Sequence, residues 1–286
     1  MTPEAKYFSK FELHCHSYYS KGSKIPTEGL PTPEEIIRRA KILGFAGVAI
    51  TDHVTTKAWK RAKIEAKKQD IIFIPSVELQ TNQGHMIALG ISEPIKNYLD
   101  LDETIDLIHD LGGIAIAPHP FDLRNEGIGK LGFKTDAIEI FNALNLDLIS
   151  NCISYKYFKK VSKSKKIGAV VGSDAHTIEM FGIAVNFMNA YNLDDVLKSI
   201  KNGDVYFKIK YVSLNEILKW VRCRLTFSRE EVISYVNSHY SLPKKWLYKK
   251  MLKKFLATSD NPWRVLANIS LQIIRLYSFL KYTSTH

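Results

Sequence analysis

The chain has 286 residues, of which 45% are hydrophobic and 24% charged, a composition that indicates a globular protein and excludes a largely disordered chain. The formal net charge of +11 is confined to one part, since residues 201–286 hold 16 Lys and Arg against five Asp and Glu. Three widely spaced cysteines exclude a disulfide framework and predict a cytoplasmic protein.

Residues 11–20, FELHCHSYYS, start with an apolar run that predicts a strand containing His14 and His16. Side chains alternate between the two faces of a strand, so both imidazoles point to one side and Cys15 points to the other. Two imidazoles on one side of a strand end are suitable metal ligands. Two unrelated surface histidines are the alternative, and the rest of the chain has to decide between them.

Helix and strand patterns then alternate up to about residue 205. The first helix begins at the capping box of Thr32 and Glu35 and ends at Gly44. Further helices are predicted at 56–69, at 101–111, through 160 and at 193–200, and apolar strands at 47–50, 71–79, 85–91, 114–117, 136–142 and 167–172. Short apolar strands between helices indicate a parallel sheet with both faces buried, and six or seven such units predict a closed (β/α) barrel.

Candidate metal ligands recur where these apolar strands end. They are His14, His16, His53, Glu78, His119, Glu139, Asp174 and His176. Active sites of α/β barrels are built at this end of the strands. Imidazole and carboxylate together suit zinc, manganese or iron, and two or three such ions can hold a phosphate and activate water. His85 begins a strand, so a ligand and a core histidine are equal alternatives for it, and Asp52 is expected to brace the turn before His53.

Five motifs in this order resemble the metal-binding motifs of the PHP family (polymerase and histidinol phosphatase): ELHCHS, AITDH, SVEL, APHP and GSDAH. The resemblance covers about residues 8–185. It implies an α/β fold, a distorted (β/α)7 TIM-like barrel, which hydrolyses phosphoesters with two or three divalent ions (Zn, Mn or Fe). It also implies the ligands: His14, His16, Glu78 and Asp174 for a first ion, Glu78 and His119, with His85 as a further candidate, for a second, and His53 and His176 for a third.

The stretch Ser20-Lys21-Gly22 departs from the Ser-Asp-Gly of many family members, whose aspartate binds the third ion. A protonated lysine cannot bind a metal ion. Three alternatives therefore stay open: a weak or absent third ion, Lys21 as a fixed positive charge beside a substrate phosphate, or Lys21 pointing to solvent. Arg124, in the loop after His119, is a candidate for phosphate binding, and His176 or His119 is the candidate acid for the leaving group.

Residues 206–286 contain none of these motifs and are expected to form a basic helical appendage to a barrel of residues 1–205. A helix over 242–257, LPKKWLYKKMLKKFLA, would place Trp246, Met251 and Phe255 on one face and lysine pairs on the other. Packing of the apolar face within the protein is one interpretation. A second interpretation is binding to nucleic acid through the lysines. A third is binding to an anionic membrane surface, as in a peripheral membrane protein.

The sequence as a whole predicts a cytoplasmic, metal-dependent phosphoesterase. Its substrate would be a phosphorylated small molecule or a nucleic-acid end, that is, a phosphomonoester or a nucleotide or oligonucleotide phosphate. A nuclease that acts on single-stranded 5′ ends is one alternative. A non-catalytic, metal-binding barrel with a basic tail for nucleic acid or membrane is the other.

Overall fold

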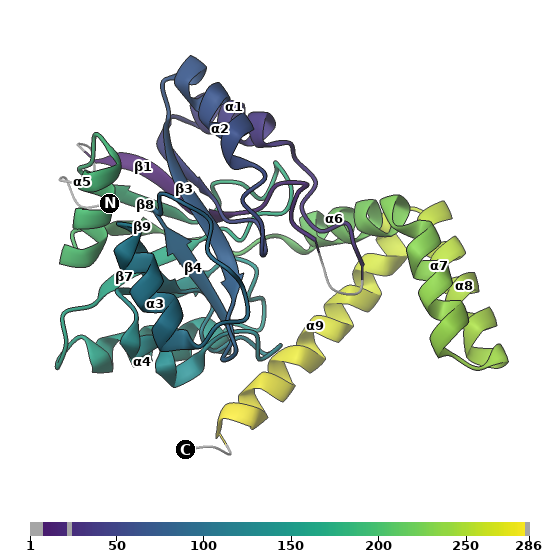
Figure 1. Ribbon diagram of the computed structural model, residues 1–286. Helices are drawn as coiled ribbons and strands as arrows, with labels where there is room; N and C mark the ends of the chain where they lie inside the picture. Colours follow the sequence, from purple (N-terminus) through teal and green to yellow (C-terminus); the bar gives the residue numbers. More distant parts are fainter. Residues whose placement is uncertain (1–7, 22–24, 284–286) are drawn as a thin grey trace.

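The computed structural model describes residues 8–21 and 25–283, and within these ranges nine strands form one curved sheet (Figure 1). The order across the sheet is β7-β6-β5-β4-β3-β2-β1-β8-β9. The strands are β1 (Ser9–Cys15), β2 (Phe45–Ile50), β3 (Ile72–Gln80), β4 (His85–Leu89), β5 (Ile114–Ala117), β6 (Ala137–Asn142), β7 (Gly168–Gly172), β8 (Val185–Met188) and β9 (Tyr206–Lys208). The nearly closed barrel confirms the predicted fold class.

The barrel closes where β1 and β7 end. The backbone N–H of Asp174 donates to the carbonyl of His14 over 2.9 Å, and the N–H of His16 donates to the carbonyl of Ala175 over 2.8 Å. These bonds join the first strand to the last of the predicted units, so residues about 160 positions apart in the sequence come to lie at one end of the barrel.

The sheet is mixed, whereas the apolar strand pattern predicted a parallel one. β4 is antiparallel to both β3 and β5, and β8 is antiparallel to β1 and β9. The turn between β3 and β4 explains the first difference, because it spans only Thr81–Gly84 and a parallel connection needs a dozen or more residues.

Five helices surround this sheet: α1 (Pro33–Leu43), α2 (Trp59–Gln69), α3 (Leu101–Asp110), α4 (Ile149–Val161) and α5 (Leu193–Asn202). A short 3₁₀ helix, η2 (Gly129–Lys134), precedes β6. The predicted capping box is present, with Thr32 and Glu35 bonded reciprocally, and Gly44 ends α1 in the left-handed conformation at φ 70°. Val48 and Ile50 of β2 belong to one buried apolar cluster and Ala49 to another, so both faces of the sheet are covered.

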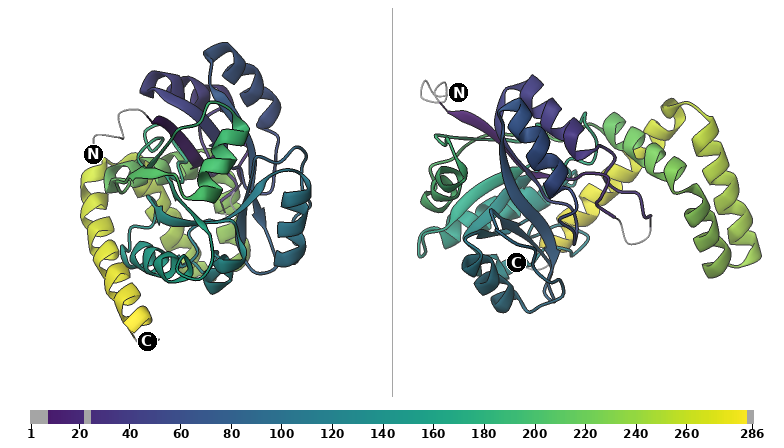
Figure 2. Two further views of the ribbon diagram at one scale, coloured as in Figure 1. Left: turned by 90° about the vertical axis from the view of Figure 1, so that its left-hand side faces the viewer. Right: turned by 45° about the horizontal axis from the view of Figure 1, so that its top comes forward.

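The appendage predicted at 206–286 starts differently, because residues 206–208 form β9 of the sheet. The remainder is helical, as predicted, and consists of α6 (Leu214–Phe227), α7 (Arg229–His239), α8 (Leu242–Ala257) and α9 (Asp260–Thr283). Helices α7 and α8 project away from the barrel, and α9 returns along its side (Figure 2). The side chain of Arg275 on α9 donates to the carbonyl of Leu146 over 3.1 Å, and the hydroxyl of Ser278 donates to Asp147 over 3.0 Å. The long helix is thereby attached to the segment before α4.

The expected packing of the apolar face of 242–257 is right for Phe255, which is buried, and wrong for Trp246 and Met251, which are 64% and 47% exposed. Helical periodicity shows that a face is apolar and leaves open whether another element covers it. Within the described residues, no helix combines the length and hydropathy that crossing a bilayer requires.

Candidate metal centre

The ends of β1, β3 and β7 bring the predicted ligands of the first ion together. The Nε2 atom of His16 lies 3.1 Å from Asp174 Oδ1, and that of His14 lies 3.4 Å from Glu78 Oε2. All four side chains are buried. The backbone of Asp174 adopts the left-handed conformation, with φ at 49°. This conformation is strained for a residue with a side chain, and such residues recur at functional sites.

Glu78 lies at the centre of the site. Its Oε1 atom is 3.0 Å from His119 Nε2 and 3.0 Å from His85 Nδ1, whereas its Oε2 atom is 3.2 Å from His53 Nδ1. The two oxygens therefore face different histidines, as a carboxylate that bridges two cations would. His85, for which the sequence left two interpretations, belongs to this cluster.

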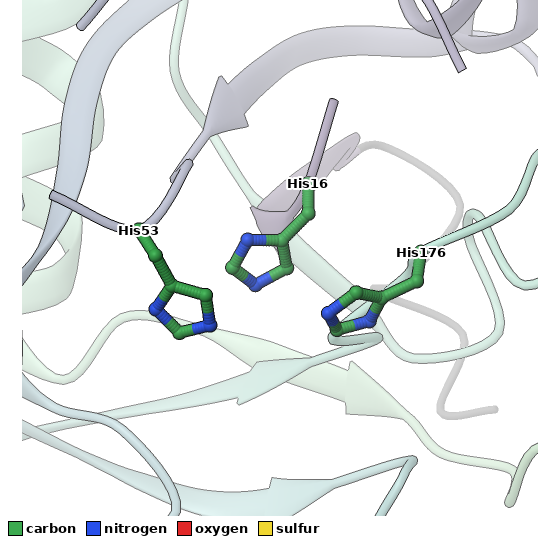
Figure 3. A group of neighbouring side chains, drawn as sticks. All are labelled: His16, His53 and His176. Carbon is green, nitrogen blue, oxygen red and sulfur yellow. The ribbon is translucent and has the colours of Figure 1, made fainter. Parts of the chain in front are cut away.

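A third group consists of His16, His53 and His176, whose rings face one another in Figure 3. The centroid of the His16 ring is 4.7 Å from that of His53 and 4.4 Å from that of His176. A carboxylate that the sequence did not single out joins them: Glu28 Oε2 is 3.5 Å from His53 Nε2, and Glu28 Oε1 is 4.0 Å from His176 Nε2. The only sequence signal for Glu28 is its place in the loop after the HxHS motif.

The ring nitrogens show that these residues fit divalent cations. In His14, His16 and His176, Nδ1 bonds to Glu139, the Ser20 hydroxyl and the Asp174 carbonyl, respectively. The Nε2 atom of each is buried without a hydrogen-bond partner among the described residues, and so is Glu78 Oε2. Buried polar atoms without partners are costly, and an imidazole held through one nitrogen with the other free is typical of metal ligands.

Two carboxylates support the cluster from outside it. Glu139, predicted as a ligand, lies behind His14: its Oε1 is 2.9 Å from His14 Nδ1, and its Oε2 accepts from the backbone N–H of His119 over 2.7 Å. Asp52 accepts from the backbone N–H and the hydroxyl of Ser17, both over 2.6 Å, as expected for a brace.

Burial and neighbouring charges shift the pKa values of several of these groups in the direction that favours cation binding. Burial lowers the pKa of His53 to about 3 and holds that of His176 well below its usual range, so both imidazoles are neutral at pH 7. Burial alone would raise the pKa of Glu78, but His53, His85 and His14 outweigh it and keep that pKa well below its usual range. The site therefore offers neutral imidazoles at His53 and His176 and an ionised carboxylate at Glu78, the protonation states that bind metal.

The mouth of the site is a cavity of about 290 Å³ next to His53 and His85. Lys21, one of its lining residues, is exposed. Arg124 also lines it, with Nε 3.1 Å from Asp122 and 2.9 Å from Glu126. The structure thus places Lys21 and Arg124, the two candidates for phosphate binding, at the entrance.

Gly172→Ala is expected to damage the site through crowding, because a methyl group at Gly172 would overlap the Glu139 carboxylate and the Cβ atom of His14. The cost in stability should be about 1–3 kcal/mol, as for other overpacked interiors. Metal analysis should show fewer bound ions. Gly203→Ala is the control: its φ of 78° also penalises alanine, but nothing lies within 4 Å, so stability should fall with the ion count unchanged. An unchanged ion count in Gly172→Ala would contradict the prediction.

A nearly closed α/β barrel with histidines and carboxylates at its strand ends defines a class of metal-binding barrel proteins. The family model described as "PHP domain" matches residues 12–222, so the chain belongs to the PHP family, as the motifs predicted. The match continues beyond residue 205 into α6, and the division of the chain at that residue stays a prediction.

Two relatives illustrate the range of this similarity. The uncharacterized protein MJ1587 of Methanocaldococcus jannaschii is 35% identical over 151 residues, which cover 51% of this chain and 88% of that protein. A protein of Haemophilus influenzae named 5′-3′ exoribonuclease is 37% identical over 73 residues, which cover 26% of this chain and 24% of that protein.

Two solved structures share the fold. One is a two-domain protein from Bacteroides vulgatus, described as containing a predicted PHP-like metal-dependent phosphoesterase; it aligns with a TM-score of 0.55 over 74% of this chain and 68% of its own. The other, PsfC from Pseudomonas syringae, aligns with a TM-score of 0.55 over 77% and 99%. Both are 14% identical in sequence to this chain, so they establish the fold alone.

Proposed function

We propose that the chain is a metal-dependent phosphoesterase that hydrolyses a phosphomonoester or a terminal phosphate of a nucleotide or oligonucleotide. The observation that carries the proposal is the position of Glu78, whose two oxygens face separate sets of histidines. Two cation positions that share one carboxylate suit phosphoryl oxygens, which are close together and negatively charged.

Most of these residues would be direct ligands of the cations, and Glu139 would orient one of the ligands. His14, His16, Glu78 and Asp174 would hold a first ion, Glu78, His85 and His119 a second, and His53 and His176 a third. When bound, such ions would polarise the phosphoryl oxygens and activate water. Glu139 would orient His14, because it contacts the ring nitrogen that faces away from the cluster.

Lys21 and Arg124 would bind the substrate phosphate at the mouth. Burial would lower the pKa of Arg124, but Glu126, Asp174 and Asp122 raise it far above its usual value, so its guanidinium is charged at every pH of interest. His119 and His176 are less suited to the acid role that the sequence suggested. His119 Nε2 faces Glu78, and the low pKa of His176 keeps its imidazole in the neutral, non-acidic form at pH 7.

Metal analysis and a substrate panel test this proposal. Protein purified without chelator should contain at least two divalent ions per chain and hydrolyse p-nitrophenyl phosphate, bis-p-nitrophenyl phosphate or a 5′-phosphorylated oligonucleotide. Asp174→Asn should lose most of that activity and at least one ion. His109→Ala is the matched control, since His109 lies on α3, where it pairs with Asp136 at the surface. A fully loaded wild-type protein that cleaves none of these substrates would refute the proposal.

Hydrolysis at nucleic-acid 5′ ends is a second candidate function. The segment that resembles the Haemophilus influenzae protein named 5′-3′ exoribonuclease supports it, although that segment is a quarter of either chain. The lysines at 249–250 of α8 are exposed, as a contact with nucleic acid or an anionic membrane surface would require. Faster cleavage of a 5′-phosphorylated oligonucleotide than of p-nitrophenyl phosphate, with a steep salt dependence, would favour this candidate.

A further inference from the structure

The third cation position lacks the carboxylate that the sequence pattern would place at residue 21. Lys21 is exposed at the mouth, whereas the Glu28 side chain is 14% exposed and lies between two histidines of that position. Its two oxygens face different imidazoles, one 3.5 Å from His53 Nε2 and the other 4.0 Å from His176 Nε2. His176 Nε2 is itself buried without a hydrogen-bond partner among the described residues.

Helix α6 of the appendage fixes the backbone that carries Glu28. The indole N–H of Trp220 donates to the Glu28 carbonyl over 2.7 Å, and Nε of Arg224 donates to the Thr27 carbonyl over 2.8 Å. The hydroxyl of Ser228, at the end of α6, accepts from the backbone N–H of Thr27 over 3.0 Å. Three side chains spaced four residues apart along α6 and its C-terminal end therefore converge on two consecutive residues of the loop.

The same helix contacts the histidine on the other side of the position. The Trp220 ring lies 4.6 Å from the His176 ring, and the Arg224 guanidinium lies 4.7 Å from the Trp220 ring. Trp220 is buried, so this contact is part of the interior. Gly29 lets the loop come this close, because a methyl group there would overlap the Ser17 carbonyl beside the site.

We propose that Glu28 supplies the carboxylate ligand of the third divalent cation and that Trp220 and Arg224 of α6 hold it in place. This proposal shares one premise with the proposed function, namely that the site binds divalent cations, and it does not require phosphoester hydrolysis. Arg224 and Ser228 lie beyond residue 222, where the match to the PHP family ends, so part of this support comes from outside the matched region. The appendage then contributes to the metal centre and is more than a separate tail.

Counting bound Mn²⁺ per chain tests this assignment without an activity assay. Glu28→Gln should bind one ion fewer than the wild type and keep the ions that Glu78 holds. Trp220→Phe keeps a ring against His176 and removes the indole N–H that holds the Glu28 backbone. It should therefore bind the third ion about 10- to 100-fold more weakly, as other proteins do when a residue that orients a metal ligand is replaced. Excess Mn²⁺ should restore the count in Trp220→Phe and leave that of Glu28→Gln unchanged.

Two matched variants serve as controls. Trp263→Phe removes an indole N–H that donates to Thr258 within the appendage, far from the histidines in sequence, and should leave the Mn²⁺ count and affinity unchanged. Lys21→Ala should also leave the count unchanged, because Lys21 is not a ligand. A wild-type count in folded Glu28→Gln would overturn the assignment, and so would Trp220→Phe with the affinity of Trp263→Phe.

The outcomes separate this inference from the proposed function. If Glu28→Gln loses one ion and the loaded wild type hydrolyses no phosphoester, the ligand assignment stands and the phosphoesterase proposal fails. If Glu28→Gln keeps every ion while the wild type hydrolyses phosphoesters, the ligand assignment fails alone. A wild type that takes up no Mn²⁺ would overturn both.

Discussion

Glu78→Gln is expected to lower phosphoester hydrolysis by about 10³-fold and to reduce the number of bound ions by at least one. Glu78 approaches His14, His53, His85 and His119 with its two oxygens, at 3.0–3.4 Å. An amide has one oxygen for ligation, carries no charge and turns N–H groups toward ring nitrogens that need a cation. Loss of cation stabilisation worth several kcal/mol corresponds to about three powers of ten in rate.

Steady-state rates and metal content, measured on the same protein samples, check this prediction. Glu65→Gln is the matched control, since Glu65 is also a buried glutamate but pairs with Arg38 on α1 over 2.8 Å, outside the metal centre. It should keep the wild-type ion count and rate. Wild-type hydrolysis by Glu78→Gln with a full set of ions would contradict the central role of this carboxylate.

The positions of most ligands follow from local pattern. His14 and His16 are two residues apart on a strand, and the other candidates follow apolar strands whose ends must meet in a barrel. What local pattern cannot supply is the partner of each group. A lone buried glutamate is costly, so Glu139 needs a partner, and its partner here is a ring nitrogen of His14, 125 residues away.

Glu28 and β4 show two further limits of the sequence. The position of Glu28 depends on Trp220 and Arg224, almost 200 residues later, so no spacing near the HxHS motif could reveal it. The antiparallel direction of β4 could have been predicted from the sequence, because the short turn at Thr81–Gly84 excludes a parallel connection. The apolar pattern alone does not give the direction, since it is the same for parallel and antiparallel strands.

Removal of the cations is expected to lower the melting temperature by on the order of 10 °C at pH 7. A ligand present at about 1,000 times its Kd stabilises the folded state by about 4 kcal/mol, and each kcal/mol shifts the melting temperature by about 2–4 °C in a domain of this size class. Without cations, Glu78 and Asp174 remain buried beside histidines that must supply the compensating charge. Calorimetry of the chelated and the Mn²⁺-loaded protein measures the difference.

The difference between the two melting temperatures should widen as the pH rises above about 6.5. Burial lowers the pKa of His14, but the carboxylates of Glu139, Asp174 and Glu78 outweigh it and raise that pKa well above its usual value. Protonated His14 therefore stabilises the metal-free protein fully below the unfolded-state pKa of about 6.5, and this stabilisation is lost as the pH rises through the higher folded-state pKa. Cations replace that proton in the loaded protein, so the same loss is absent there.

Glu12 provides an internal check on this pH dependence. Burial raises the pKa of Glu12 to about 7, which makes the folded state less stable as the pH rises from about 4.5 to 7. Glu12 accepts from the Ser173 hydroxyl and from the backbone N–H groups of Gly182 and His14, and none of these donors is a metal-binding side chain. This loss should therefore affect the loaded and the metal-free protein alike and cancel in their difference. A difference in melting temperature that stays constant or narrows between pH 6.5 and 9 would show that His14 does not carry the compensating proton.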